Sequence, residues 1–152
     1  MGVVTLLALW VHVLGVVVWL GGVLYQAHIL LPIARRGGVA TFAEAARRQR
    51  PFAWTALGLV VLTGFYNVTR LGPLDTVMES GAGLMLAAKL FLVLLLIAIA
   101  AQRDFTHLVR LGIALSTSDD PTPTLRTIAW LDRISILLAL AIVYLGLAVS
   151  RS

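Results

Sequence analysis

The residue best suited to chemistry in this chain is His12, an imidazole inside the apolar run 9–22. An ionisable group at that depth in a membrane is unfavourable, and it is therefore a candidate for function. Imidazole nitrogens coordinate metals and exchange protons near neutral pH. Helical spacing puts Gly15, Trp19 and Gly22 on the same stripe as His12. The two glycines either allow close helix packing or leave room for a flat, large ligand against the backbone.

Lys89 is the second candidate, because it is a lysine within a long apolar segment. At about 1.5 Å per residue, it lies about 12 Å into its helix, and His12 lies about 14 Å in from the same side. The antiparallel helices bring Asn67 and Tyr144 to this level and Arg70 to the surface above it. The sequence predicts one polar pocket formed by these side chains. The alternative is that Lys89 snorkels to the headgroups and His12 is a hydrogen-bonded core residue.

The remaining histidines, His28 and His107, lie at a different level. They follow the first two candidates by about 24 Å and about 27 Å along their helices. A second, inner site is one interpretation, and exposed interfacial histidines are the preferred one. The chain has no cysteine, which excludes disulfides, iron–sulfur clusters and thiolate metal sites. It also has no glycine-rich phosphate loop and no recognisable serine, histidine and acid spacing, so soluble-enzyme catalysis has no support.

The composition places these candidates in a membrane. Of the 152 residues, 60% are hydrophobic and 12% are charged, and the mean hydropathy is +0.97. These values predict an integral membrane protein with one domain over 1–152, and the lipid bilayer as its main partner. The net charge of +5 is a topology signal and does not indicate nucleic-acid binding.

Four apolar segments predict an all-α, antiparallel up-down four-helix transmembrane bundle, with helices at about 3–31, 52–69, 83–111 and 128–149. Each approaches the roughly 20 residues that cross a bilayer as a helix. The first helix is expected to end before Pro32. A separate short helix is expected at 41–48, with Thr41 as N-cap and Glu44 in capping-box position. The pair at 132–133, Asp-Arg, is expected at the membrane surface.

The distribution of arginines between the loops predicts the orientation. Two of the three connecting regions are strongly basic: the first has Arg35, Arg36, Arg47, Arg48 and Arg50, and the third has Arg103, Arg110 and Arg126. The middle one has Arg70 together with Asp75 and Glu79. The positive-inside rule then puts both termini outside, in a multi-pass protein of a bacterial-type cytoplasmic (inner) membrane.

Several stretches, in order, resemble the CopD-like family, which is named for copper-resistance and copper-uptake proteins. They are the H-x6-W-x-G-G pattern at 12–22, Leu-Leu-Pro followed by two arginines at 30–36, Leu-Thr-Gly-Phe-Tyr-Asn at 62–67, and Lys-Leu-Phe-Leu-Val-Leu at 89–94. The His12 and Lys89 elements are also similar to the HemJ-like protoporphyrinogen oxidases, which are small haem-binding helical bundles. That second resemblance implies that His12 is a haem ligand and Lys89 a second ligand or an essential partner.

The first function hypothesis is a haem b membrane protein with a redox or small-gas role. His12 Nε2 coordinates the iron, the two stripe glycines give room for the macrocycle, and Trp19 and Tyr144 pack on the ring. Lys89 or Arg70 pairs with the propionates. If the chain is an enzyme, this hypothesis makes it a haem-dependent membrane oxidoreductase that serves an electron-transfer partner or a small-molecule oxidant.

The second hypothesis is copper uptake or copper binding. Cu(I) prefers sulfur ligands, and Met78 and Met85, seven residues apart, could approach His12 from the outer side. The third is a cofactor-free structural or partner-binding bundle, in which His12 and Lys89 satisfy each other or a water. Lipid-facing glycines such as Gly21 allow a homodimer in any of the three.

Overall fold

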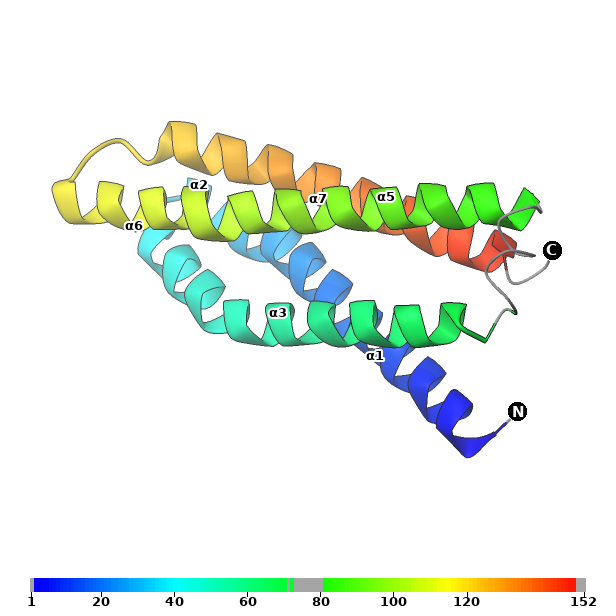
Figure 1. The fold of residues 1–152 in the computed structure, drawn as a ribbon. Helices are drawn as coiled ribbons and strands as arrows, with labels where there is room; N and C mark the ends of the chain where they lie inside the picture. The colour runs from blue at the N-terminus through cyan, green and yellow to red at the C-terminus, as the bar shows by residue number, and fades with distance from the viewer. Residues whose placement is uncertain (1, 71, 73–80, 150–152) are drawn as a thin grey trace.

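The computed structural model describes residues 2–70, 72 and 81–149, and its regular elements there are all helices (Figure 1). In chain order they are α1 (Val3–Tyr25), the π-helix η1 (Gln26–Leu30), α2 (Leu31–Arg35), α3 (Val39–Val68), α5 (Gly81–Gln102), the π-helix η2 (Arg103–His107), α6 (Leu108–Thr117) and α7 (Thr122–Val149).

These elements form four long rods, each long and apolar enough to cross a membrane: Val3–Arg35, Val39–Val68, Gly83–Thr117 and Thr122–Ala148. The predicted all-α, four-helix membrane architecture is thereby confirmed. A rod of 35 residues, such as Gly83–Thr117, is about 52 Å long at 1.5 Å per residue. A bilayer core is only about 30 Å thick, so the rods extend past the hydrocarbon.

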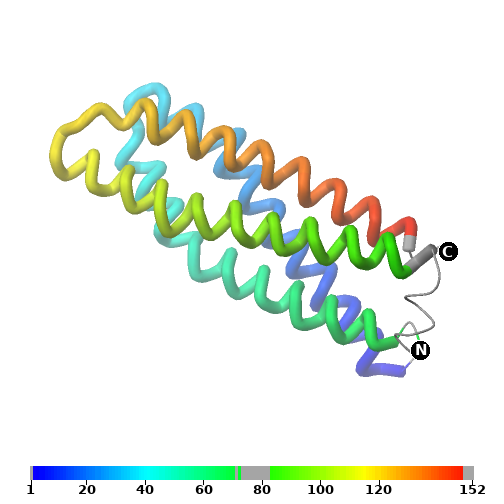
Figure 2. Tube along the Cα trace, turned by 45° about the horizontal axis from the view of Figure 1, so that its top comes forward, coloured from blue at the N-terminus to red at the C-terminus, as the bar shows by residue number. Residues whose placement is uncertain are grey.

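The rods are antiparallel and form two pairs. α1 packs mainly on α3, and α5 packs mainly on α7. The start of α1 and the end of α7 lie at one end of the bundle, here called the termini end; the turns at 36–38 and 118–121 lie at the other, the turn end (Figure 1). In both ribbon and tube views the start of α1 diverges from α5 and α7 (Figures 1 and 2). The pairs therefore meet at the turn end and separate toward the termini end.

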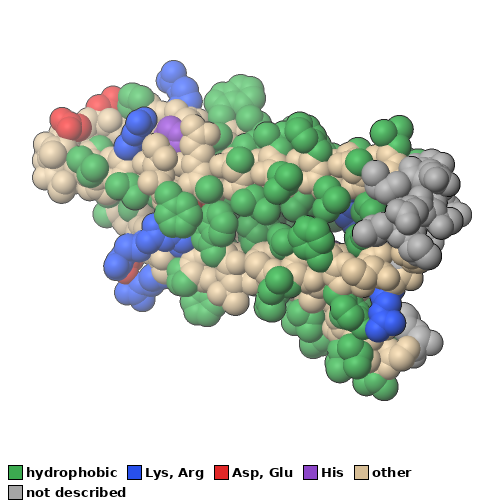
Figure 3. Space-filling view, in the orientation of Figure 1, with side chains coloured by type: hydrophobic (Ala, Val, Ile, Leu, Met, Phe, Trp, Pro, Cys, Tyr) green, Lys and Arg blue, Asp and Glu red, His purple; other side chains and the backbone are tan. Residues whose placement is uncertain are grey.

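Two apolar clusters hold the pairs together. The one at the turn end contains Leu30, Leu31, Ala34, Phe42, Leu111, Leu125, Ile128 and Ala129. The other lies in the middle of the bundle and contains Trp19, Ala56, Leu57, Leu96, Ala100 and Ala139. Most other large apolar side chains are on the outside, where they cover much of the visible face between the two ends (Figure 3). Such a surface suits a lipid environment.

The first helix does not end at Pro32, contrary to the prediction. The backbone passes through the π-turn η1, where Leu31 N–H bonds Gln26 O five residues back, and continues as α2 to Arg35. Pro32 then lies in the first turn of α2, where a missing N–H is tolerated. The chain reverses at Gly37, whose φ of 105° suits glycine.

The predicted separate helix at 41–48 is also wrong, because one helix runs through Pro51 from Val39 to Val68. Side chains buried on both sides of the proline hold it together, which compensates for one lost backbone bond. The N-cap is Gly38 and no side chain caps it, so Thr41 has no capping role. Glu44 instead bonds Arg47 and Arg48, at 2.7 and 2.6 Å.

The last two helices are longer than predicted at the turn end. The third rod continues past 111 to Thr117, where Ser118 adopts a left-handed conformation with φ 59° and ends it. The fourth begins at Thr122 and not at 128. Asp120 Oδ1 accepts a hydrogen bond from the Thr122 backbone N–H at 3.0 Å, which satisfies a free donor of the first turn.

Candidate functional site

The His12 ring lies between α1 and α3 with a defined orientation. Its Nδ1 is 3.0 Å from Thr63 Oγ1, and the Thr63 hydroxyl donates to Leu59 O at 2.5 Å. The assignment that satisfies both contacts gives the one Thr63 proton to Leu59 O and makes Thr63 Oγ1 the acceptor of His12 Nδ1–H. The neutral imidazole then carries its lone pair on Nε2. Histidines that bind metals are oriented in this way, by a hydrogen bond from the nitrogen that does not bind.

Gly64 provides the space for this ring. A Cβ built on Gly64 would lie 3.3 Å from His12 Cε1 and 3.8 Å from Nδ1. A side chain there would push the imidazole away from α3. The Thr63-Gly64 pair therefore positions His12 through one donor–acceptor contact and one close approach.

Lys89 lies on the facing pair of helices. A Cβ on Gly146 of α7 would be 3.0 Å from Lys89 Nζ, so the ammonium rests against the α7 backbone. The Lys89 side chain is half-buried, and its charge acts on His12. The structure thus places an imidazole within the α1–α3 pair and an ammonium within the α5–α7 pair, close enough for the ammonium charge to act on the imidazole.

The space beside the stripe glycines is filled by α3. A Cβ on Gly15 would be 2.7 Å from Val60 Cγ2 and 3.2 Å from Ala56 O, so this glycine allows α1 and α3 to approach closely. A Cβ on Gly22 would meet the Gln49 side chain, 3.2 Å from its Cδ. The room expected for a flat ligand against the α1 backbone is therefore occupied by protein at both positions.

Trp19 is buried, with 6% of its surface exposed, among the apolar side chains of the middle cluster. Tyr144 is 72% exposed on α7. Trp19 is thus a core residue, and Tyr144 is not enclosed in a pocket with His12.

Two more predicted pocket residues belong to the end of α3. Arg70 donates to Tyr66 Oη at 2.6 Å and lies 5.1 Å from the centre of that ring. Asn67 is half-buried in the last turn, and its backbone O accepts from Arg70 N at 3.2 Å. Arg70 is therefore tied to its own helix. Within the described part of the chain, the interaction found between two members of the predicted pocket is the electrostatic one of Lys89 with His12.

The other candidate ligands do not gather into a second metal site in the described part of the chain. His28 is exposed, and its Nδ1 lies 3.1 Å from Leu24 O on the same helix. His107 lies half-buried in η2. Within residues 2–70, 72 and 81–149, no three His, Asp or Glu side chains are grouped to hold a metal ion. Met85 is 40% exposed on α5, and Met78 lies outside the described residues.

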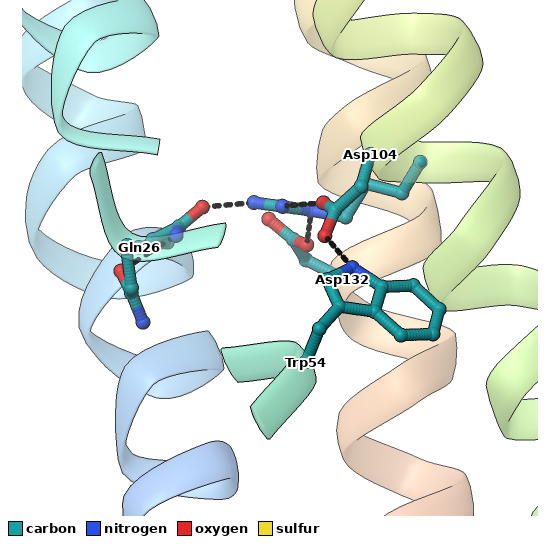
Figure 4. A network of polar contacts seen from close by, with 6 residues as sticks. Gln26, Trp54, Asp104 and Asp132 are labelled. Carbon is teal, nitrogen blue, oxygen red and sulfur yellow. Dashed lines mark hydrogen bonds and ion pairs between the residues drawn. The ribbon is translucent and has the colours of Figure 1, made fainter. Parts of the chain in front are cut away.

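The sequence analysis missed a buried ionic network at the turn end, here called the Arg103 network. Arg103 donates from Nη1 to Asp104 Oδ1 at 2.6 Å, from Nε to Asp132 Oδ1, and from Nη2 to Gln26 Oε1 (Figure 4). Trp54 Nε1 donates to Asp104 Oδ2 at 2.9 Å. The prediction that Asp132 lies at the membrane surface is wrong, because it is 0% exposed.

The start of the fourth helix explains why this network was hard to foresee. A helix that begins at 128 puts Asp132 near the membrane surface, whereas α7 begins at Thr122 and carries Asp132 into the bundle. There it meets Gln26 of η1 and Arg103 and Asp104 of η2. The available signal was the Arg103-Asp104 pair, which lies inside the predicted helix at 83–111. Arg133, in contrast, is exposed and lies 5.9 Å from the Trp130 ring, as expected for an interfacial cation.

Four apolar rods enclosing a buried ionic network define a multi-pass membrane protein. A family model for copper resistance protein D (CopD) matches residues 43–149. This is well over half of the chain, and the chain therefore belongs to the CopD family. The match begins within α3, so α1 with His12 precedes it. Comparison with curated proteins and with solved structures found no match.

Proposed function

We propose that this chain handles copper within a membrane and that His12 Nε2 is its copper ligand. The observation that carries the proposal is the contact between His12 Nδ1 and the Thr63 hydroxyl, which favours the Nδ1–H tautomer and with it an Nε2 lone pair for a metal. Membership of the copper resistance protein D family supports copper as that metal. Imidazole is an accepted ligand for copper.

A soft second ligand is needed for Cu(I), and methionine supplies it in a chain without cysteine. Met85 is one helical turn before Lys89 on α5 and is 40% exposed. We propose that its thioether reaches the ion from the termini end, with Met78 as a further donor.

The charge of Lys89 is expected to weaken copper binding at this site. An ammonium that acts on His12 repels a cation bound to the imidazole. Copper is then held more weakly than at a storage site. Weak binding favours transfer of the ion, because an ion must leave a transport site as readily as it enters.

We propose that the termini end faces outward from a cytoplasmic membrane and that copper reaches His12 from that side. The support is the distribution of charge, because the arginines of α2, the first half of α3 and α6 lie toward the turn end. Cytoplasmic segments of membrane proteins are enriched in Lys and Arg.

The proposal is tested by metal analysis of the full chain purified in detergent and equilibrated with Cu(I). The wild type is expected to retain copper, and His12→Ala to lose it with an unchanged helical circular-dichroism spectrum. His28→Ala is the matched control, since His28 is exposed and bonded to its own helix. Equal copper in wild type and His12→Ala contradicts the proposal.

Haem b stays a prediction of the sequence and has its own test. A Soret band in protein from haem-replete cells, lost in His12→Ala, would establish that His12 binds haem. It would refute the proposal that His12 binds copper. The filled spaces at Gly15 and Gly22 support the smaller ion. A protein that binds neither ligand is the cofactor-free bundle.

A further inference from the structure

Two buried oxygens of α7 have no hydrogen-bond partner in the described part of the chain. They are Asp132 Oδ2 and Ser135 Oγ, on side chains of residues that are 0% and 2% exposed. The second carboxylate oxygen of Asp132 carries none of the contacts drawn in Figure 4. A polar atom left unpaired in a protein interior is unfavourable, so each atom points to a missing donor or acceptor.

Both residues line a small cavity of about 20 Å³ next to the Arg103 network. A cavity of about 10–15 Å³ holds one water molecule if polar groups surround it. Gln49, Arg50 and Trp19 line the same cavity from the first pair of helices. The site is therefore large enough for one water and too small for an organic ligand.

The charges of the network do not balance. Arg103 is one cation, and it contacts the carboxyl groups of both Asp104 and Asp132. The charge of Arg103 attracts the Asp132 carboxylate, and the charge of Asp104 repels it. With both carboxyls ionised, the network carries one uncompensated negative charge away from water, which is strongly unfavourable.

Arg50 is a second cation at the edge of this cavity. It is half-buried, its guanidinium lies 5.5 Å from the centre of the Phe105 ring, and the ion pairs of Asp104 and Asp132 in the described part of the chain are with Arg103. Gln26, Gln49, Trp54 and Ser135 are uncharged. A proton on one carboxyl group neutralises the network without any further ion.

The hydrogen bonds select which carboxyl takes the proton. Both oxygens of Asp104 accept hydrogen bonds, from Arg103 and from Trp54, so this group is satisfied as a carboxylate. Asp132 Oδ1 accepts from Arg103, and Oδ2 receives no hydrogen bond in the described structure. A hydrogen on Asp132 Oδ2 would not clash with any hydrogen-bond donor there. It would also make Oδ2 a donor, which the unpaired Ser135 Oγ lacks.

We propose that Asp132 is a proton-binding site that holds its proton on Oδ2 at neutral pH, shared with one water molecule that bridges to Ser135 Oγ. Uptake is a simple addition: the carboxylate and a proton from solvent give the carboxylic acid. The water accepts the Oδ2–H hydrogen bond and donates to Ser135 Oγ. This site is in the Arg103 network and does not depend on copper or on His12.

The direct test is the infrared spectrum of the full chain in phosphatidylcholine vesicles at pH 7. A protonated carboxyl gives a C=O stretching band, separate from carboxylate bands, that shifts in D₂O. The band is expected in the wild type and absent in both Asp132→Asn and Asp104→Asn, because either change leaves Arg103 balanced by a single carboxylate. It is expected to be retained in Asp120→Asn, the control, since Asp120 is exposed and outside the network. Absence of the band in the wild type at pH 7, or its survival in Asp132→Asn, overturns the proposal.

Thermal unfolding in detergent provides a second readout with the same variants. Asparagine mimics the protonated acid, because its oxygen accepts from Arg103 and its NH₂ donates into the cavity. We expect Asp132→Asn to melt close to the wild type at pH 7. Asp104→Asn is expected to melt lower, because one of its two accepting oxygens becomes a donor. A larger loss in Asp132→Asn than in Asp104→Asn contradicts the proposal.

The pH dependence has a definite sign. In the unfolded chain an aspartate is ionised above about pH 4, whereas folded Asp132 keeps its proton. The native state then binds one more proton than the unfolded state, so the unfolding equilibrium constant rises with pH by up to about tenfold per pH unit. Asp132→Asn removes this dependence. The same slope in the variant and the wild type overturns the assignment.

Discussion

The two polar regions of the bundle are enclosed to very different degrees. His12 and Lys89 are half-buried, His12 between α1 and α3 and Lys89 against the α7 backbone. Arg103, Asp104 and Asp132 are buried where the pairs meet. In the first region the His12 imidazole is oriented by Thr63. In the second, the hydrogen bonds are satisfied except at Asp132 Oδ2 and Ser135 Oγ. An open site suits an exchanging ion, and a closed network suits holding four helices in register.

The largest effect is expected from a substitution that disrupts the buried Arg103 network. Arg103→Leu leaves the carboxyls of Asp104 and Asp132 without their cation, and removing one partner of a buried pair costs about 3–5 kcal/mol. The expected result is a large loss of unfolding free energy in denaturant titrations in detergent, or failure to accumulate in membranes. Arg126→Leu is the matched control, since Arg126 is exposed. Equal stability of the two variants would show that the network does not hold the pairs together.

The second effect tests why α1 and α3 approach so closely. Gly15→Val places atoms against Val60 and Ala56, where even a Cβ would be 2.7 Å from Val60 Cγ2. Overpacking of this kind typically costs about 1–3 kcal/mol of unfolding free energy. Gly21→Val is the control, because nothing lies within 4 Å of a Cβ there. A stable Gly15→Val protein would mean that the space beside α1 is open, as the haem prediction requires.

The third effect separates His12 orientation from His12 presence. Thr63→Val removes the acceptor of the Nδ1–H bond while keeping the shape of the side chain. Loss of such a partner typically weakens metal binding about 10–100-fold. Thr63→Ser keeps the hydroxyl and is expected to bind like the wild type in a Cu(I) competition titration. An unchanged Cu(I) affinity in Thr63→Val would show that the Thr63 hydroxyl has no role in copper binding.

A fourth prediction has opposite signs for the two cofactors. Lys89→Leu removes a cation that repels copper at His12, and we expect Cu(I) to bind about tenfold more tightly if the two charges interact at an intermediate effective dielectric. If Lys89 instead ligates or pairs with haem, the same change weakens binding. The direction of the affinity change, measured by titration, therefore distinguishes copper from haem b.

The smallest effect concerns the start of α7, far from both regions. Hydrogen bonds from the Thr122 hydroxyl and from the Thr122 backbone N–H hold the pKa of Asp120 below its usual range. A lowered pKa makes the contact stabilising at neutral pH, and this stabilisation is lost as the pH falls through the lowered pKa. Asp120→Ala is expected to lower the melting temperature slightly at pH 7 and not at strongly acid pH. An equal decrease at both pH values would assign the effect to packing.

The contrast between the regions also explains what the sequence could predict. Hydropathy is enough to identify four membrane helices, because apolar length is a property of composition. His12 and Lys89 could be placed at one level because the helix between the termini end and each residue is regular. The Arg103 network was not predicted, because a fourth helix that begins at 128 puts Asp132 at the surface, whereas α7 begins at Thr122 and buries it.

The roles of Gly15 and Gly22 could not be predicted without the position of the partner helix α3. Gly15 and Gly22 on one stripe fit either a ligand or close packing, and only the positions of Val60 and Gln49 decide between them. Pro32 and Pro51 misled the boundary predictions for a similar reason. Tertiary burial on both sides of Pro51 stabilises a helix that local sequence rules would interrupt.

X-ray absorption at the copper edge tests the central claim most directly. The full chain, loaded with one equivalent of Cu(I), is compared with His12→Ala loaded in the same way. The account predicts an imidazole nitrogen together with sulfur in the wild-type shell, and loss of the imidazole contribution in the variant. A copper shell that is identical in the two proteins would contradict His12 as the ligand.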